Sequence, residues 1–370
     1  MIDALPLLFE GGISNYLKPL VQALLKYAGR DLHLKLLFRL SIDGMRRQLY
    51  GRYVSENSST KKHNLTTHLP DRLLNIIWSR GCYLPFSLPN RSDDFFIAST
   101  EMVPRKGACR VGWIVYDLTP LCIPKFFASM PDHYRDKMKS LAKRTDFIAT
   151  ISRNSKKDIV ELLHYPEDRV YVIYPGVSPS KERCAMPSVS GRRPYVYYIG
   201  SLALNKNVDG MLRIFSQCVN RYGLDFDLVL TGKDFCGRPF WDQMIRELNI
   251  EGRVRITGWI SEHDRENYLN HATMLWQFSW YEGFGLPVLE AASRGIPVLY
   301  SNRGALPEIL NNPEQEIDPD DEEEAAWKAA QALMSPDTLS GWKKSGLQRS
   351  LGFSWEASAR RLIRHLREMN

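Results

Sequence analysis

The chain has 370 residues, which exceeds the usual size of one hydrophobic core and predicts two domains of roughly 150 to 200 residues each. Hydrophobic residues make up 44% and charged residues 25%, a globular composition that excludes long disordered regions. The formal net charge of +7 suggests an acidic neighbour such as phosphate, nucleic acid or anionic lipid, although a basic run on a helix is more often a solvated face.

The six cysteines lie far apart, without a C-x-x-C pair, and predict free thiols in a reducing compartment. Apolar stretches such as Leu73 to Trp78 are far shorter than the roughly 18 residues that a membrane-spanning helix needs. The first residues lack the charged and then apolar pattern of a signal peptide. We therefore expect a cytoplasmic protein, either free or peripheral on the inner face of the cell membrane.

The first half predicts alternating strands and helices. In chain order these are helix Tyr16 to Tyr27, strand Leu34 to Phe38, helix Arg72 to Trp78, strands Asp94 to Ala98 and Arg110 to Asp117, a basic helix through Met138, strand Phe147 to Ser152, helix Ser155 to Leu163 and strand Val170 to Tyr174. Pro6 interrupts Met1 to Leu8, so we expect a very short first strand or a start that omits part of it. The polar stretch Ser55 to His63 predicts a loop that helps to shape an acceptor site.

The segment Pro175 to Arg193 is rich in Pro, Ser and Gly and predicts a linker between domains. The second half then predicts repeated strand and helix units, typical of a doubly wound parallel sheet. These are strand Tyr195 to Ile199, a helix capped by Asn207 and stopped by Gly223, strand Phe226 to Thr231, helix Trp241 to Leu248, strand Val254 to Thr257, helix Glu262 to His271, strand Met274 to Trp280, a helix from Leu286 to Gly295 and strand Ile296 to Tyr300.

The segment from Tyr281 to Glu290 has the sequence Y-E-G-F-G-L-P-V-L-E. Gly283 and Gly285 allow a ligand to approach the backbone closely, and the amides that begin the following helix direct a positive dipole at a bound phosphate. Glu282 and Glu290 can orient the hydroxyls of an extended ligand from its two ends. An ordinary turn with surface glutamates is the alternative interpretation of this segment.

The same segment resembles the hallmark of glycosyltransferase family 4, a group of retaining enzymes with the GT-B fold. Further resemblance lies in G-G-I-S-N-Y from Gly11, Y-D-L-T-P from Tyr116, I-S-R-N-S from Ile151, Y-I-G-S-L-A-L-N-K-N from Tyr198, T-G-W from Thr257, L-P-E-I from Leu306 and S-W-E-A from Ser354. The resemblance implies an α/β protein with two Rossmann-like doubly wound domains facing across a cleft. Residues 1–178 would bind the acceptor and residues 179–354 the donor, while a C-terminal helix, 355–370, crosses back to the first domain.

The resemblance also implies a nucleotide-diphosphate sugar as donor substrate, with no cofactor and no metal. The implied donor-binding residues are Gly200, Ser201, Lys206, Lys233, Glu282, Gly283, Phe284, Gly285, Leu286 and Glu290, and the implied catalytic residues are Glu282, Lys206 and Asp117. The implied cleft and acceptor residues are Gly11, Gly12, Tyr116, Asp117 and Ser152. From the residues alone, Lys206 can equally be solvated, Asp117 can cap a turn and the two glycines can form a simple loop.

Two positions depart from the family pattern: Tyr116 stands where many relatives have His, and Asn205 stands where an Arg often precedes the Lys. The diphosphate is therefore expected to recruit Arg303 or Lys233, and a catalytically silent protein that serves a glycosyltransferase complex is the alternative function. The Y-D-L-T-P variant resembles bacterial surface-polysaccharide mannosyl- and rhamnosyltransferases. This favours GDP-mannose over UDP- or dTDP-sugars, and a lipid-linked saccharide acceptor with contact between the Arg-rich C-terminal helix and an anionic membrane.

Other chemical classes fit the sequence less well. Asp318-Pro319-Asp320 and Asp225-Phe226-Asp227 match a metal-binding Asp-x-Asp motif, but the first is expected to cap a helix and the second to lead into a buried strand. A dinucleotide dehydrogenase would need a G-x-G-x-x-G segment, which the sequence lacks. The basic helix Arg135 to Arg144 could contact nucleic acid, but such a binder has no use for the Glu282 to Glu290 segment. No nucleic-acid partner is expected.

Overall fold

A computed structural model describes residues 1–9, 11–29, 32–40, 44–79, 94–105, 109–128, 130–177 and 193–369. The chain divides into two compact units. The first unit comprises Met1–Leu121, Ser129–Gly176 and Ser354–Asn370, and the second comprises Cys122–Ala128 and Val177–Phe353. The expected domain boundary at 178, and most of the expected linker, lie outside the described residues.

The first unit is built on a parallel sheet of seven strands in the order β3-β2-β1-β4-β5-β6-β7. The strands are β1 (Ile2–Asp3), β2 (Leu36–Arg39), β3 (Asn64–Thr67), β4 (Phe95–Ala98), β5 (Arg110–Val115), β6 (Phe147–Thr150) and β7 (Val170–Val172). Strands β2, β4 and β6 are buried along their whole length, as expected where helices cover both faces of a sheet. The strand order reverses between β1 and β4, so the carboxyl ends of these strands border a crevice that favours ligand binding.

The helices of the first unit are α1 (Gly12–Tyr27), α2 (Gly44–Glu56), α3 (Asp71–Ser79), α4 (Thr119–Cys122), α5 (Pro131–Ala142), α6 (Arg153–Leu163) and α14 (Trp355–Glu368). The prediction of a loop over Ser55–His63 was wrong, because this stretch completes α2 and continues as a 3-10 helix, Ser58–His63, before β3. Helix α2 buries only Tyr53, whose ring lies 5.1 Å from that of Phe38. With a single buried anchor, α2 has no apolar periodicity that the sequence could have shown.

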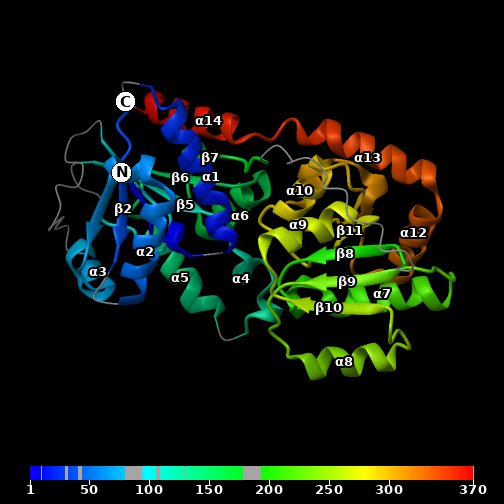
Figure 1. Cartoon of the computed structure of the whole chain (residues 1–370). Helices are drawn as coiled ribbons and strands as arrows, with labels where there is room; N and C mark the ends of the chain where they lie inside the picture. The colour runs from blue at the N-terminus through cyan, green and yellow to red at the C-terminus, as the bar shows by residue number, and fades with distance from the viewer. Residues whose placement is uncertain are drawn as a thin grey trace. The chain divides into compact units, whose positions relative to one another are not determined.

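Helix α14 belongs to the first unit and packs along α1 (Figure 1). The ring of Tyr16 lies 5.7 Å from that of Trp355, and the hydroxyl of Ser358 donates a hydrogen bond to the carbonyl of Tyr174. The backbone passes very close at the crossing, since a Cβ atom on Gly176 would lie 2.2 Å from the amide nitrogen of Trp355. The predicted return of the C-terminal helix to the N-terminal fold is confirmed.

The second unit is built on a parallel sheet of six strands in the order β10-β9-β8-β11-β12-β13. The strands are β8 (Tyr195–Ile199), β9 (Asp227–Thr231), β10 (Val254–Gly258), β11 (Met274–Gln277), β12 (Val298–Ser301) and β13 (Glu316–Ile317). The helices are α7 (Val208–Asn220), α8 (Arg238–Glu247), α9 (Glu262–His271), α10 (Leu286–Ser293), α11 (Leu306–Leu310), α12 (Glu322–Met334) and α13 (Pro336–Ser350). The prediction of a doubly wound α/β architecture is confirmed in both halves of the chain (Figure 1).

Asn207 precedes α7, but its side chain does not cap the helix as predicted. The residue is in the left-handed conformation, with φ at 54°, and its side-chain amide donates a hydrogen bond to the carbonyl of Phe278 at 3.1 Å. The start of α7 is thereby joined to the segment that follows β11. Among the described residues, no helix is both long enough and apolar enough to cross a membrane.

Candidate functional site

The conspicuous polar cluster of the second unit lies where β8 and β11 end. These strands are neighbours in the parallel sheet, so the segments that follow them emerge at the same edge. The backbone amide of Trp280 donates a hydrogen bond to the carbonyl of Asn205 at 3.3 Å and joins the two segments directly. This pairing brings together Lys206 and Glu282, which the sequence could place only on separate loops.

Glu282 is held by three donors at one oxygen. Its Oε1 atom accepts hydrogen bonds from Lys206 Nζ at 2.8 Å, from Ser279 Oγ at 2.7 Å and from Gln277 Nε2 at 3.1 Å. The side chains of Lys206 and Glu282 are 22% and 15% exposed, so the pair is shielded but reachable by a ligand. Charge-assisted hydrogen bonds of this kind fix a carboxylate in place before any ligand arrives.

Glycines allow the loops at this edge to approach closely. Gly285, with φ at 107°, precedes α10, and a Cβ atom there would lie 2.5 Å from the side chain of Leu306. A Cβ atom on Gly232 would lie 1.8 Å from the carbonyl oxygen of Gly200, so the segments after β8 and β9 touch through these two residues. The amides of Gly285 and Leu286 lie at the amino end of α10, where the helix dipole favours an anion.

The remaining residues predicted to bind the donor already have partners. Glu290 accepts a hydrogen bond from Arg265 at 2.6 Å, and Lys233 lies 5.0 Å from the centre of the Phe235 ring. Arg303, an expected substitute cation, forms ion pairs with Asp318 and Asp320 at 2.7 and 2.6 Å. Gly283 and Phe284 are buried, and the carbonyl of Ser201 accepts a hydrogen bond from Tyr198.

The predicted acceptor residues lie in the first unit. Asp117 caps a turn, since its Oδ1 atom accepts hydrogen bonds from the backbone amide and the hydroxyl of Thr119 at 2.9 and 2.7 Å. Ser152 caps α6 by accepting a hydrogen bond from the amide of Ser155. Gly12 begins α1 and Gly11 precedes it. The turn-capping alternative for Asp117 therefore describes its observed contacts.

Tyr116 follows β5 and packs its ring edge-on against Tyr16, with 5.6 Å between ring centres. Its hydroxyl is buried and has no hydrogen-bond partner among the described residues. Burial, assisted by Tyr16 and the charge of Asp3, raises the pKa of Tyr116 well above its usual value. The hydroxyl therefore stays protonated and can donate a hydrogen bond to a ligand.

Lys125 is a neighbour of the candidate site that the sequence did not indicate. The segment Cys122–Ala128 belongs to the second unit, although the flanking residues belong to the first. It places Lys125 Nζ 4.1 Å from the centre of the Trp280 ring and Phe126 6.3 Å from the same ring. The only local signal is a lysine followed by two phenylalanines, which does not reveal the distant tryptophan.

A buried ion pair at the carboxyl ends of β1 and β2 was also missed. Arg39 and Asp3 are 2% and 1% exposed, and two nitrogen atoms of the guanidinium donate to the carboxylate at 3.3 and 3.2 Å. Arg39 also pairs with Asp71 at 2.7 Å, and Asp71 with Arg46 at 3.0 Å. Removing one partner of a buried ion pair leaves the other charge buried and unpaired, which is costly. The cluster therefore fixes the carboxyl ends of β1 and β2, where the charge of Asp3 also acts on Tyr116.

In the described part of the chain, no group of three or more His, Cys, Asp or Glu side chains is arranged to hold a metal. The Asp318-Pro319-Asp320 motif was expected to cap the following helix, but α12 is capped by Asp321, and Asp318 and Asp320 pair with Arg303. Asp225 pairs with Arg253 and Arg193, and the hydrogen bond from Arg253 is the main reason that its pKa is lowered. Both Asp-x-Asp matches thus make contacts with arginine.

Comparison with known proteins finds sequence similarity to glycosyltransferases. Residues 186–349 match the family model of glycosyl transferases group 1. The chain is 29% identical over 254 residues to O-antigen chain mannosyltransferase B of Escherichia coli, a match that covers 65% of this chain and 66% of that protein. It is 24% identical to O-antigen chain mannosyltransferase RfbU of Salmonella typhimurium, with 58% of each chain covered. The chain thus spans less than two thirds of the length of these relatives.

Solved structures of other proteins resemble this structure over almost the whole chain. Sucrose-phosphate synthase from Thermosynechococcus elongatus superposes with a TM-score of 0.73 at 18% identity, covering 99% of this chain and 97% of that one. The HepE protein of Anabaena, solved with UDP and glucose, gives a TM-score of 0.72 at 15% identity, covering 99% and 98%. The predicted GT-B fold is confirmed, as is the resemblance to bacterial polysaccharide mannosyltransferases.

Proposed function

We propose that this chain, whose residues 186–349 match the model of group 1 glycosyl transferases, moves a hexose from a nucleotide-diphosphate sugar to a hydroxyl of a growing saccharide. The observation that carries the proposal is the pair formed by Lys206 and Glu282 beside the amino end of α10. A cation, a carboxylate and helix amides at one sheet edge suit a ligand with a diphosphate at one end and hydroxyls at the other.

The donor would lie along the segment from Glu282 to Glu290. Lys206 and the amides of Gly285 and Leu286 would bind the diphosphate, Glu282 would orient the sugar and Glu290 the ribose. The contact between Glu290 and Arg265 gives this carboxylate a fixed direction without neutralising its ability to accept hydroxyl hydrogen bonds. GDP-mannose is the favoured donor, because relatives named as mannosyltransferases match most of the chain.

The proposed reaction retains the configuration of the anomeric carbon. The acceptor hydroxyl attacks that carbon from the face that the diphosphate leaves, the new C–O bond forms as the bond to the diphosphate breaks, and a diphosphate oxygen takes the proton. Lys206 stabilises the negative charge that grows on the leaving group, which is where fixed electrostatics lower a barrier most. Neither a metal nor a protein nucleophile is required.

A diphosphate carries more charge than Lys206 can balance, since Lys206 is already paired with Glu282. Arg265 and Arg303 are paired with carboxylates, whereas Lys125 lies against the face of an aromatic ring and forms no ion pair with a described residue. Lys125 is exposed, and its ring partner Trp280 lies two residues before Glu282 and is bonded to the backbone of Asn205. We therefore include Lys125 as a second cation for the leaving diphosphate.

The acceptor is proposed to be a saccharide, lipid-linked, in surface-polysaccharide synthesis, bound near Tyr116 in the first unit. The Tyr116 hydroxyl, which has no hydrogen-bond partner among the described residues, supports this placement. A buried hydroxyl without a partner costs stability unless a ligand accepts its hydrogen bond. A lipid-linked acceptor would place the enzyme on the inner face of the cell membrane.

Thermal shift with GDP, UDP, dTDP, ADP and their sugars tests the proposal, because a ligand that binds only the folded state raises the melting temperature. We expect a shift with one nucleotide family that is lost in Glu290→Ala, and transfer of sugar from the matching donor. No shift with any of them would contradict the donor site and favour a catalytically silent protein that serves a glycosyltransferase complex.

A further inference from the structure

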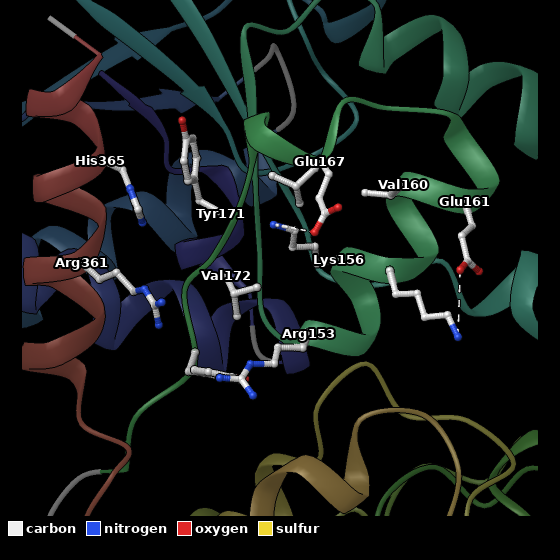
Figure 2. Close-up of a pocket in the computed structure, with 12 residues that line it drawn as sticks. Arg153, Lys156, Val160, Glu161, Glu167, Tyr171, Val172, Arg361 and His365 are labelled. Atoms are coloured by element: carbon white, nitrogen blue, oxygen red, sulfur yellow. Dashed lines mark ion pairs between the residues drawn. The ribbon is translucent and has the colours of Figure 1, made fainter.

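The lining of a groove in the first unit includes none of the residues assigned to donor or acceptor. The groove has a volume of about 560 Å³ and runs between α6, strand β7 and α14 (Figure 2). Strand β7 is the last described strand in its sheet, so one of its edges faces no other strand in the described part of the chain. The groove therefore follows an open sheet edge between two helices.

Cations outnumber carboxylates on the walls of this groove. Lys156 pairs with Glu167 at 3.6 Å and Lys157 with Glu161 at 4.0 Å, so each carboxylate faces one lysine. The lining also includes Arg153 from α6 and Arg361 from α14, both exposed. In Figure 2 these arginines lie at one end of the groove, away from Glu161 and Glu167. The lining as a whole carries four cationic side chains and two carboxylates, and therefore a net positive charge.

The floor of the groove combines a flat aromatic surface with a backbone donor. The rings of Tyr171 and His365 are stacked, with 4.2 Å between their centres and 25° between their planes. Burial lowers the pKa of His365, so its ring is neutral near neutral pH and the positive charge comes from the arginines and lysines. Because Ile173 donates its amide to Thr150 of β6, the alternation of a strand turns the amide of Val172 toward the open edge.

We propose that this groove binds a phosphate ester, with the phosphate between Arg153 and Arg361 and the organic group against Tyr171. Guanidinium groups bind phosphate oxygens with paired, directional hydrogen bonds, and an aromatic face accommodates the CH surface of a sugar or glycerol unit. The ester is either the headgroup of an anionic phospholipid or a soluble sugar or glycerol phosphate. This site does not depend on the proposed donor site, because none of its lining residues belongs to it.

Binding is tested with the full chain in two arms. Isothermal titration with glycerol 1-phosphate and inorganic phosphate measures the soluble ligand, and sedimentation with phosphatidylglycerol or phosphatidylcholine vesicles measures the lipid. We expect one arm to show binding that weakens as salt is added. Arg153→Gln/Arg361→Gln should then lose about tenfold or more in affinity, the scale of one or two charge-assisted contacts.

Arg360→Gln/Arg364→Gln is the matched control, because it removes the same charge, and both arginines are exposed on α14 and do not line the groove. It should keep the wild-type affinity, and both variants should keep the wild-type melting temperature, since every substituted side chain is exposed. Binding to phosphatidylglycerol vesicles but not to soluble esters would identify a site for a lipid headgroup. Binding to soluble esters but not to vesicles would identify a site for a soluble metabolite. Absence of binding in both arms, or equal losses in the groove variant and the control, would overturn the proposal.

Discussion

Lys206 Nζ lies 2.8 Å from Glu282 Oε1, so the cation proposed to bind the diphosphate also holds the carboxylate proposed to orient the sugar. The carboxylate does not depend on Lys206 alone, because Ser279 and Gln277 donate to the same oxygen. Removal of Lys206 should therefore impair the chemistry without releasing Glu282.

For Lys206→Met, we expect kcat to fall by about 100-fold or more, the usual effect of losing one stabilising group at a developing charge. The free energy of unfolding should change by no more than about 1 kcal/mol, because a partly exposed ion pair stabilises little. Steady-state kinetics and urea unfolding measure the two effects. Lys344→Met, which removes an exposed lysine of α13 that is not among the residues assigned to the donor, is the control and should stay closer to wild type. Transfer by Lys206→Met at nearly the wild-type rate would refute the role given to Lys206.

Lys125 is expected to act on the donor through its charge. Lys125→Met should raise the KM for the nucleotide sugar by about tenfold, as expected for one lost charge contact. Lys125→Arg keeps the charge and should recover most of the loss. The KM and the affinity for the free nucleoside diphosphate are both measured, because a role in packing against Trp280 alone would leave nucleotide affinity unchanged. Equal behaviour of the Met and Arg variants would exclude the electrostatic role.

Substitution of Gly232 tests the close contact between the loops that follow β8 and β9. Gly232→Ala places a Cβ atom 1.8 Å from the carbonyl oxygen of Gly200, at a φ of 148°. We expect a loss of at least about 2 kcal/mol in the free energy of unfolding, because both backbones must shift. Gly341→Ala is the control, since Gly341 lies within α13 with no atom within 4 Å of an added Cβ. It should stabilise the protein by roughly 0.5 to 1 kcal/mol, and similar unfolding midpoints for the two variants would contradict the contact.

The sequence was most informative where the chemistry is local. The segment from Glu282 to Glu290 keeps its two carboxylates, its glycines and its helix start within a few residues, so its shape could be predicted before its neighbours were known. The alternation of buried strands and amphipathic helices likewise predicted most strands of both sheets, although β3 and β13 were not predicted. The position of Lys206 beside Glu282 followed only from the pairing of β8 with β11.

Long-range contacts account for what the sequence did not indicate. Arg39 and Asp3 are buried together by the pairing of β1 with β2, and neither residue shows this in its local pattern. Lys125 meets Trp280 because a short segment of the first half belongs to the second unit. Asn207 was expected to cap a helix, but its amide instead bonds the distant carbonyl of Phe278. In each case a tertiary partner decides the role of the residue.

Substitution of Tyr116 tests whether its hydroxyl has a functional or a structural role. Its hydroxyl is buried without a partner among the described residues, so Tyr116→Phe should leave the free energy of unfolding unchanged or raise it by up to about 1 kcal/mol. If the hydroxyl donates to the acceptor or the transferred sugar, kcat/KM should fall by about 10-fold or more, the scale of a lost hydrogen bond to a ligand. Because burial raises the pKa of Tyr116, this loss should be the same at every pH from about 6 to about 9.

Tyr16→Phe is the matched control, because the Tyr16 hydroxyl donates a hydrogen bond to the buried carbonyl of Ile173 at 3.1 Å. Its removal leaves that carbonyl unsatisfied and should cost about 1 to 3 kcal/mol of stability, with transfer by the folded fraction retained. Urea unfolding and initial rates of transfer, measured on both variants, distinguish the two hydroxyls. A Tyr116→Phe variant that loses stability but keeps its rate would assign Tyr116 to packing and move the acceptor contact elsewhere.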